Sequence, residues 1–329
     1  MGTTVKTVLV TGSLGLVGSE AMDFFAQKGW KTHGIDNNMR TTLFGVEPAK
    51  IQGETVDIRN EKEVDFVFSR NKFDAIIHTA GQPSHSWSEK EPLTDFDINA
   101  RGTLILLEAT RKYCPDAPFI FCSSDKIYGT NMDVKLSQGR TRYVHYGAFD
   151  ESLSLDHAMR TPFGCSKTAA DLYVQEYGYY FGIKTVCFRP GCITGRRHKG
   201  AKEHGFLANL TRCAREDETF PLYGFQGKQV RDNIHSYDLV NAMWHFIQKP
   251  KIAAVYNIGG GFERSCSPIE AIEMCEKILG RKMKVEYIDK EHKADRAWDI
   301  HDVSKFRKDY PEWEYKYSLK DIMKELCVL

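Results

Sequence analysis

The chain has 329 residues, of which 42% are hydrophobic and 27% are charged, and its formal net charge is +1. This length exceeds one minimal domain, and the near-neutral charge predicts neither nucleic acid nor an anionic membrane as a partner. No apolar run reaches the length of a membrane span, and the N-terminal MGTTVKTVLV leads directly into a strand-like segment, so we expect a cytosolic protein without a signal peptide.

The nine cysteines are scattered along the chain, and no two of them form a CxxC pair. An odd number at such spacings predicts neither a disulfide framework nor a zinc site, and it suits the reducing cytosol. The spacing of His198, Glu203 and His204 also fits no known ligand pattern, so we expect no metal.

The first half of the chain alternates short β-branched runs with helical patterns, which is typical of a parallel sheet with helices on both faces. Strands are expected at residues 7–10, 31–35, 53–56, 75–78, 118–121 and 184–189. Helices are expected at 16–28, 99–113 and 167–180, with an irregular stretch at 130–160. The sequence therefore predicts a Rossmann-type α/β fold with a doubly wound parallel sheet.

Beyond Arg189 the pattern indicates a smaller C-terminal portion that contains helices. These helices are expected at residues 206–215, 236–248, 268–279 and 319–326, and a strand near Val255 is expected to rejoin the large sheet. We predict a cofactor-binding domain at 1–189, to which about 229–258 returns, and a substrate-binding lobe at 190–228 and 259–329.

The run VLVTGSLGLVG places Gly12, Gly15 and Gly18 between a strand and a helix. Glycine allows a tight turn and a close approach of the backbone to a pyrophosphate, and the helix start offers free N–H groups to its negative charge. Asp36 ends the next strand, where its carboxylate can accept hydrogen bonds from the adenosine ribose and repel a 2′-phosphate. The sequence thus predicts a dinucleotide site that prefers NAD over NADP.

Open α/β sheets bind ligands at the carboxyl ends of their strands, so we expect further cofactor contacts there. Asp57 and Ile58 are expected beside the adenine, and Ala80 and Gly81 where the cofactor passes close to the backbone. Arg40 can instead be a solvated or substrate-side residue. The full expected set adds Leu14, Leu16, Val17, Asn37, Arg40, Gln82, Asn99, Lys167 and Arg189.

These motifs resemble those of the extended short-chain dehydrogenase/reductase family of nucleotide-sugar epimerases and dehydratases. The resemblance rests on TGSLGLVG, NARGTLILLEA, SSDKIYG, Lys167, FRPGCITG and VRDNIHSYD and covers nearly the whole chain. Within the family, GIDNNMR, AGQPSH, GKQVRD and NIGGG are most similar to the CDP-paratose (CDP-tyvelose) 2-epimerase group. The resemblance implies an epimerase that acts at C2 of a CDP-sugar by transient oxidation to a keto-sugar, and a homodimer formed through the helices at 100–113 and 167–180.

The resemblance also assigns the catalytic residues, and one of them departs from the family. Ser124 is expected to hydrogen-bond the reacting oxygen, and Lys167 to hold the nicotinamide ribose. The family has a catalytic tyrosine four residues before the lysine, but this chain has Phe163. Losing a general base costs a factor of roughly 100 to 10,000 in rate, so this departure matters.

Three accounts of Phe163 stay open at this point. The protein is an engineered Tyr→Phe variant, or another group serves as the acid/base, or the chain is a non-catalytic NAD and sugar-nucleotide binding protein. His85 in AGQPSHS is the best candidate for the second account because an imidazole titrates near neutral pH. His85 can equally well only hydrogen-bond a sugar hydroxyl.

The substrate side is assigned from the same resemblance. The related 4,6-dehydratases have an Asp-Glu pair where this chain has Asp125 and Lys126, and an ammonium cannot serve as that base, so dehydration is disfavoured. Arg231 and Arg296 are expected on the diphosphate, and His204 is expected to line the nucleotide pocket. A net NAD-dependent sugar-nucleotide dehydrogenase, which would release the ketone, stays open as an alternative.

Overall fold

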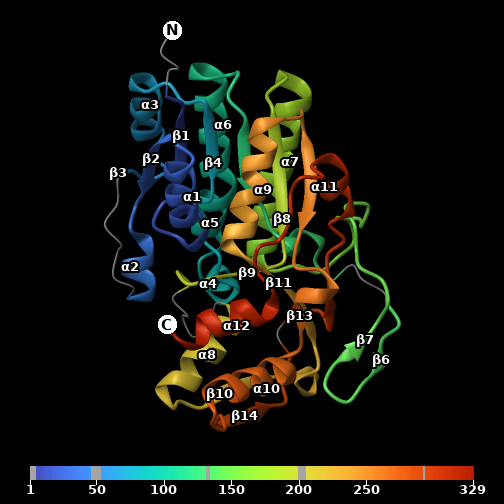
Figure 1. The fold of residues 1–329 in the computed structure, drawn as a ribbon. Coiled ribbons are helices and arrows are strands. Elements are labelled where there is room, and N and C mark those ends of the chain that lie inside the picture. The colour runs from blue at the N-terminus through green and yellow to red at the C-terminus, as the bar shows by residue number, and fades with distance from the viewer. Residues whose placement is uncertain (1–4, 46–52, 131–133, 199–204, 292) are drawn as a thin grey trace. The chain divides into compact units, whose positions relative to one another are not determined.

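The computed structural model of the protein describes residues 5–45, 53–130, 134–198, 205–291 and 293–329. The chain divides into two compact units. Unit 1 comprises residues 1–124, 162–189 and 239–256, and unit 2 comprises residues 125–161, 190–238 and 257–329. Both units are therefore built from segments that are far apart in the sequence, and the colours of Figure 1 follow them from the blue N-terminus to the red C-terminus.

Unit 1 is built on a seven-stranded sheet with the strand order β12-β8-β5-β4-β1-β2-β3. The pairs from β3 to β8 are all parallel. The order reverses between β1 and β4, which is where open α/β sheets bind ligands. The predicted doubly wound parallel fold is confirmed. The strands are β1 (Thr7–Thr11), β2 (Lys31–Asp36), β3 (Gly53–Thr55), β4 (Ala75–His78), β5 (Phe119–Cys122), β8 (Thr185–Pro190) and β12 (Ala254–Ile258).

Helices cover both faces of this sheet because alternate strand residues point to opposite sides. On one face, α3 (Glu61–Arg70), α6 (Gly102–Tyr113) and α7 (Pro162–Phe181) share a buried apolar cluster with strand residues such as Phe119 and Phe121. On the other face lie α1 (Leu16–Gln27) and α9 (Ser236–Gln248), where the ring centroids of Phe25 and Trp244 are 5.6 Å apart. Figure 1 shows these long helices running alongside the strands.

Helix α7 begins at Pro162, five residues before the predicted start at Lys167. Proline suits the first turn of a helix because its fixed φ angle matches the helix and its missing N–H would have no partner there. Phe163 therefore lies in the first turn of α7 and not in a loop. The remaining helices of unit 1 are α2 (Met39–Phe44), α4 (His85–Lys90), α5 (Pro92–Phe96) and the π-helical turn η1 (Asp97–Arg101).

Unit 2 has its own sheet and its own core. Strand β11 (Val230–His235) is buried along its whole length and pairs with β9 (Cys192–Thr194), β13 (Ser265–Cys266) and β15 (Trp298–Asp299). A second apolar cluster joins α8 (Phe206–Glu216), α10 (Pro268–Leu279) and α12 (Leu319–Cys327). Unit 2 also contains η2 (Asp125–Tyr128), β6 (Ser137–Gln138), β7 (Tyr143–Val144), β10 (Phe220–Tyr223), η3 (Phe225–Gly227), η4 (Phe262–Arg264), β14 (Val285–Ile288) and α11 (Ser304–Asp309).

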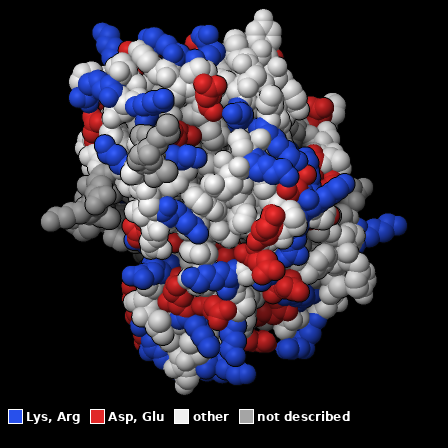
Figure 2. All heavy atoms as spheres, turned by 45° about the horizontal axis from the view of Figure 1, so that its top comes forward, with Lys and Arg blue, Asp and Glu red and all other residues white. Residues whose placement is uncertain are grey.

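The surface carries charges of both signs. On the face drawn in Figure 2, the blue Lys and Arg side chains are interspersed with red Asp and Glu side chains, in keeping with the net charge of +1. Among the residues that the structure describes, no helix combines the length and the apolar character that a membrane span needs.

We predict that Asp171→Ala destabilises the protein strongly, by about 3–5 kcal/mol in the free energy of unfolding. Asp171 is buried in α7, where it accepts hydrogen bonds from Arg189 Nη2 at 2.7 Å and from Ser123 Oγ at 2.6 Å. The substitution removes the carboxylate that neutralises the buried guanidinium. Urea denaturation followed by circular dichroism measures the loss.

Asp65→Ala is the matched control, because Asp65 pairs with Lys112 on the surface of the same unit. Solvent screens such a pair, so this variant should leave the free energy of unfolding nearly unchanged. Equal losses in the two variants would contradict the importance of the buried pair.

Candidate active site

The turn between β1 and α1 leaves no room for side chains. Gly12 has a φ angle of +68°, and a Cβ atom there would lie 2.6 Å from the backbone N of Ala80, which follows β4. A Cβ atom on Gly18 would lie 2.1 Å from the carbonyl oxygen of Gly12. Gly15 is the N-cap of α1, and no side-chain oxygen there accepts from the first N–H groups of the helix. This cradle at the reversal of strand order fits the diphosphate of a dinucleotide.

Asp36 is tied to this turn. Its Oδ2 accepts a hydrogen bond from the backbone N of Leu14 at 3.1 Å, and its Oδ1 accepts one from Asn38 at 2.9 Å. The carbonyl oxygen of Ile35 also accepts from Gly12 N at 2.8 Å. The structure thus brings the acid and the glycine turn together, as an adenosine ribose site requires.

Asp57 lies one step further along the same edge. Asn37 Nδ2 donates to Asp57 Oδ2 at 3.0 Å, and the guanidinium of Arg59 holds both carboxylate oxygens. The pKa of Asp57 is lowered to about 2, and the hydrogen bonds that Arg59 donates are the largest cause. Asp57 is therefore an ionised acceptor throughout the physiological range.

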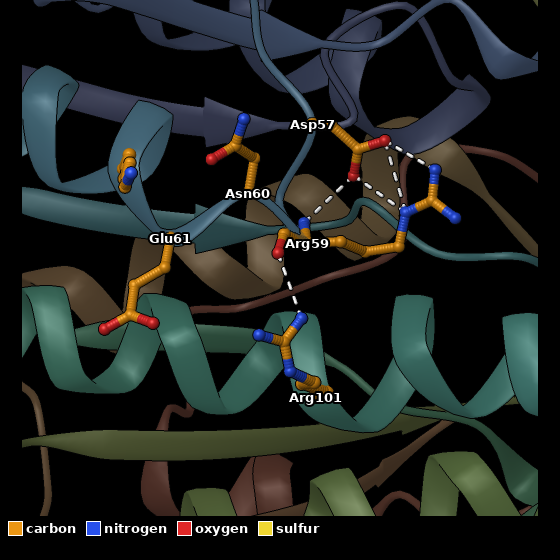
Figure 3. Close-up of a pocket in the computed structure, with 6 residues that line it drawn as sticks. Asp57, Arg59, Asn60, Glu61 and Arg101 are labelled. Atoms are coloured by element: carbon orange, nitrogen blue, oxygen red, sulfur yellow. Dashed lines mark hydrogen bonds and ion pairs between the residues drawn. The ribbon is translucent and has the colours of Figure 1, made fainter.

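A pocket of about 650 Å³ opens beside Asp57 (Figure 3). Arg101, from η1, reaches across it and donates from Nη1 to the carbonyl oxygen of Arg59 at 3.0 Å. The lining was not foreseen from the sequence, except for Asp57 itself. It comprises Asp57, Arg59, Asn60, Glu61, Lys62 and Arg101.

Asn99 connects the end of β4 to helix α7. Its Oδ1 accepts from Gln82 N at 2.9 Å, and its Nδ2 donates to Gln82 O and to Ser166 Oγ, both at 3.1 Å. Asn99 lies in the π-helical turn η1, and such turns occur frequently at functional sites. The amide therefore fixes the loop that contains Gly81, where an added Cβ would lie 3.8 Å from Lys167 Nζ.

Lys167 is buried in α7, and its Nζ donates to the carbonyl oxygen of Cys122 at 2.7 Å. Burial lowers the pKa of Lys167, and nearby groups including Asp171 and Asp95 oppose that shift. Ser124 is buried two residues after Cys122, just past the carboxyl end of β5, and Lys167 contacts the same strand end from α7.

Phe163 occupies the position of the missing phenol. Its ring is 7% exposed, and its backbone N donates to Ser88 Oγ at 3.1 Å. The imidazole of His85, at the start of α4, contacts it edge-on with ring centroids 4.9 Å apart. The structure thus places the alternative acid/base candidate directly against the altered position.

Arg189 pairs with Asp171 in the interior of unit 1 and is 4% exposed. Its assignment to the cofactor stays a prediction, as do those of Leu16, Val17, Arg40, Ile58 and Ala80. His204 lies outside the described residues.

Unit 2 contains a buried cluster of charged residues. Arg296 Nη2 donates to Asp125 Oδ2 at 2.7 Å and to Asp299 Oδ2 at 2.8 Å. Lys126 Nζ donates to the same two oxygens at 2.8 and 3.1 Å. Burial lowers the pKa of Lys126, but Asp125 and Asp299 outweigh it and raise that pKa. Lys126 is therefore held as an ammonium.

His301 belongs to the same cluster and was missed in the sequence, together with Asp299 and the role of Asp232. Its Nδ1 lies 2.9 Å from Asp232 Oδ1, while Asp232 Oδ2 accepts from the backbone N of His301 at 3.0 Å. The pattern DRAWDIHD, with acids flanking a histidine, is the only local signal for this arrangement. Asp232 is distant in sequence, so the pair could not have been derived from the chain alone.

Arg231 and Arg296 both face carboxylates in this structure. Arg231 Nη2 donates to Asp295 Oδ1 at 2.5 Å. A guanidinium has five N–H donors, so such a pairing leaves donors for a phosphate. Their assignment to the diphosphate stays a prediction.

The chain has relatives of known activity. The model of the NAD dependent epimerase/dehydratase family matches residues 8–259. The CDP-paratose 2-epimerase of Salmonella typhi is 30% identical over 95% of this chain and 96% of its own length. The dTDP-glucose 4,6-dehydratase of Xanthomonas campestris is 26% identical over 96% of this chain and 90% of its own length. The structure of UDP-glucose 4-epimerase from Thermotoga maritima with UDP-glucose superposes with a TM-score of 0.83, at 26% identity, over 98% of this chain and 97% of that one.

We predict that His301 stabilises the folded protein in a pH-dependent way. Burial alone would lower the pKa of His301, but the carboxylates of Asp232, Asp299 and Asp125 raise it above its ordinary value. This stabilisation is complete below the unfolded pKa of about 6.5 and is lost as the pH rises through the raised pKa of the folded state.

His301→Asn removes the titrating ring. The free energy of unfolding of the wild type minus that of this variant should therefore be largest near about pH 6 and shrink as the pH rises. Urea titrations across the range measure it. A difference that does not change with pH would show that the ring is not charged in the folded protein.

Proposed function

Because this chain belongs to the NAD dependent epimerase/dehydratase family, we propose that it is an NAD-dependent nucleotide-sugar epimerase that acts on a CDP-linked sugar. One observation carries the choice of substrate: the 30% identity with CDP-paratose 2-epimerase extends over 95% of the chain. On this proposal the sugar is oxidised transiently at C2 to a keto-sugar and is then reduced from the opposite face.

The residues of unit 1 fit the family's cofactor. When bound, NAD accepts a hydride from the sugar and returns it. The cradle at Gly12, Gly15 and Gly18 would hold the diphosphate, because a Cβ atom at Gly12 or Gly18 would fill that space. Asp36 would accept hydrogen bonds from the adenosine ribose. Lys167, anchored by Cys122 O, would hold the nicotinamide ribose.

Lys126 supports epimerisation over dehydration. Elimination of water needs a base where the 4,6-dehydratases have a glutamate, and here Asp125 and Asp299 hold an ammonium at that place. These carboxylates also raise the pKa of Lys126, so its side chain stays protonated at neutral pH and cannot act as a base. Ser124 would hydrogen-bond the reacting sugar oxygen.

Phe163 bears directly on how fast the reaction can proceed, because a phenyl ring cannot take the hydroxyl proton. We infer that this form turns over slowly, with His85 as the titratable group in contact with the altered ring. Phe163 also favours a second candidate function, a protein that binds NAD and a sugar nucleotide without catalysing a reaction.

We further propose a cytosolic homodimer that pairs through α6 and α7. Helix α7 exposes several large apolar or aromatic side chains, which a helix-to-helix interface would cover. They are Leu172, Tyr173, Tyr179, Tyr180 and Phe181. All nine cysteines are free thiols, which suits a reducing compartment.

We predict that Phe163→Tyr raises the rate of interconversion of CDP-paratose and CDP-tyvelose by roughly 100- to 10,000-fold, because it restores the proton-transfer group. Chromatography of the two CDP-sugars measures the rate. Phe66→Tyr, an exposed change on α3 of the same unit, is the control and should have no effect.

A wild-type rate that Phe163→Tyr leaves unchanged and that His85→Asn abolishes would instead identify His85 as the base. Inactivity of both the wild type and Phe163→Tyr, with NAD still bound, would support the non-catalytic function. Either outcome contradicts the inference that Phe163 limits the rate.

We predict that Asp36→Asn weakens the preference for NAD over NADP by at least about tenfold, since it removes the charge that repels a 2′-phosphate. Isothermal titration with each dinucleotide gives the two Kd values. Asp65→Asn, which lies on the surface of the same unit, should leave their ratio unchanged. An unaltered ratio in Asp36→Asn would mean that the carboxylate does not face the ribose.

A further inference from the structure

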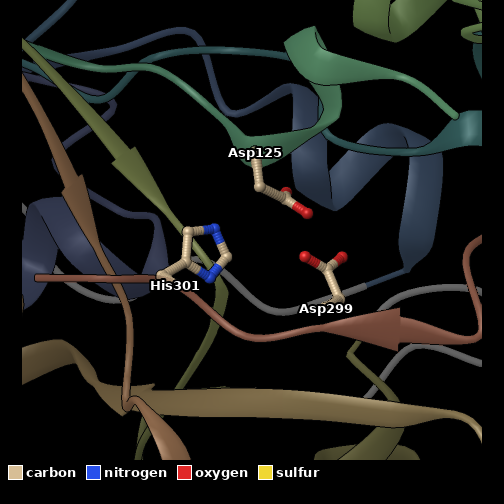
Figure 4. A group of neighbouring side chains, drawn as sticks. All are labelled: Asp125, Asp299 and His301. Atoms are coloured by element: carbon tan, nitrogen blue, oxygen red, sulfur yellow. The ribbon is translucent and has the colours of Figure 1, made fainter. Parts of the chain in front are cut away.

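The side chains of Asp125, Asp299 and His301 face one another inside unit 2 (Figure 4). We call these three residues the buried triad. One carboxylate oxygen of each aspartate and one ring nitrogen of the histidine lie within 4.8 Å of one another. The side chains of Asp299 and His301 are 2% and 0% exposed.

Two polar atoms of the triad lack a hydrogen-bond partner among the described residues: Asp299 Oδ1 and His301 Nε2. The other ring nitrogen of His301 is engaged by Asp232, which fixes the ring and turns Nε2 away from that partner. Leaving a buried donor or acceptor unsatisfied is costly, so native proteins rarely do so without a ligand or water at the site.

Glycines fix the position of this ring. A Cβ atom on Gly191 would lie 2.3 Å from Asp232 Oδ1 and 3.0 Å from the His301 ring, and one on Gly259 would lie 2.2 Å from Asp232 Oδ2. The backbone at Gly191 and Gly259 therefore packs directly against the Asp232–His301 pair.

The charges of the cluster exclude an ion as the missing partner. A divalent cation would lie beside the ammonium of Lys126 and the guanidinium of Arg296, both of which already hold the triad's carboxylates. An anion would lie beside the carboxylates of Asp125 and Asp299. With His301 as an imidazolium, the cluster has as many cations as carboxylates. The carboxylates are Asp125, Asp232, Asp295 and Asp299, and the cations are Lys126, Arg231, Arg296 and His301.

Within the triad, one ring nitrogen and one carboxylate oxygen lack a partner among the described residues, which suits a neutral group that both accepts and donates, namely a hydroxyl. An oxygen about 2.8 Å from each of two atoms can bridge polar atoms up to about 5.6 Å apart. The ligand atoms of the triad, one from each residue, lie within 4.8 Å of one another. Lys126 and Asp295, whose side chains are 23% and 24% exposed, are the least buried of these charged residues.

We propose that Asp299 Oδ1 and His301 Nε2 bind one hydroxyl group of the sugar of the nucleotide-sugar substrate. The hydroxyl donates to Asp299 and accepts from the Nε2–H of His301. This inference rests on the proposed function, in which Ser124 contacts the reacting sugar oxygen. Asp125, one member of the triad, follows Ser124 directly in the sequence.

Two substitutions at one position separate this role from a structural one. His301→Asn keeps an N–H near the position of Nδ1, facing Asp232, and deletes Nε2. His301→Gln keeps an N–H near the position of Nε2 and loses the contact with Asp232. A purely structural histidine is replaced better by Asn, whereas a hydroxyl-binding histidine is replaced better by Gln.

The experiment measures Kd by isothermal titration for CDP-paratose and for CDP, with wild type and both variants in the presence of NAD. The ratio of the two values gives the contribution of the sugar. We expect His301→Asn to reduce this contribution about tenfold or more while the Kd of CDP stays unchanged, and His301→Gln to retain most of it. Circular dichroism melts confirm that each variant is folded.

An unchanged sugar contribution in His301→Asn would overturn the proposal and would mean that an ordered water occupies the site. Equal weakening of CDP and CDP-paratose, or better retention by Asn than by Gln, would overturn it in favour of a structural role. UDP-glucose and UDP form a second pair of probes.

The two ligand pairs, CDP-paratose with CDP and UDP-glucose with UDP, test the role of His301 separately from the choice of CDP-sugar as substrate. If the wild type binds UDP-glucose but no CDP-sugar, the CDP assignment fails while the second pair still tests His301. If the wild type binds none of the four, the proposed function fails and this inference fails with it.

Discussion

The close approach between the end of β1 and the end of β4 is the constraint on which the cofactor region depends. Gly12 and Ala80 are so close that any Cβ at residue 12 would clash with the backbone. The same approach lets Ile35 and Asp36 hydrogen-bond the turn, which sets the carboxylate beside the start of α1. One backbone arrangement, at the point where the strand order reverses, therefore sets the glycine turn and the Asp36 carboxylate together, and we propose that they hold the diphosphate and the adenosine ribose.

In unit 2 the buried charged residues are held by ion pairs with one another. Lys126, Arg296 and His301 are each buried or half-buried, and each is held by at least one carboxylate. Burying such charges is tolerable only when they are paired and hydrogen-bonded. The pairing also decides chemistry, because it keeps Lys126 protonated and directs one edge of His301 away from Asp232. The family supplies the fold, and these side chains, with Phe163, distinguish what this chain can do with it.

The sequence allowed the cofactor half to be predicted because its signals are local. Gly12, Gly15, Gly18 and Asp36 lie within 25 consecutive residues, and each has a conformational or electrostatic reason for its place. Helix α10 was also predicted with its observed bounds, since Ser267 and Pro268 form a clear start signal. The start of α7 was placed too late because Pro162 and Gly164 are typical loop residues, although proline also suits the first turn of a helix. The buried triad could not be predicted, because Asp125 is far from Asp299 and His301 in the sequence and the three side chains come together only in the folded chain.

The central claim is that a dinucleotide is held at the carboxyl edge of the large sheet, whatever residue occupies position 163. The most direct measurement is to denature the purified protein, identify any released dinucleotide by mass spectrometry, and titrate the remaining apoprotein with NAD. The account predicts NAD in the released fraction, or saturable binding of one NAD per chain by the apoprotein. A protein that releases no dinucleotide and shows no affinity for NAD would contradict it.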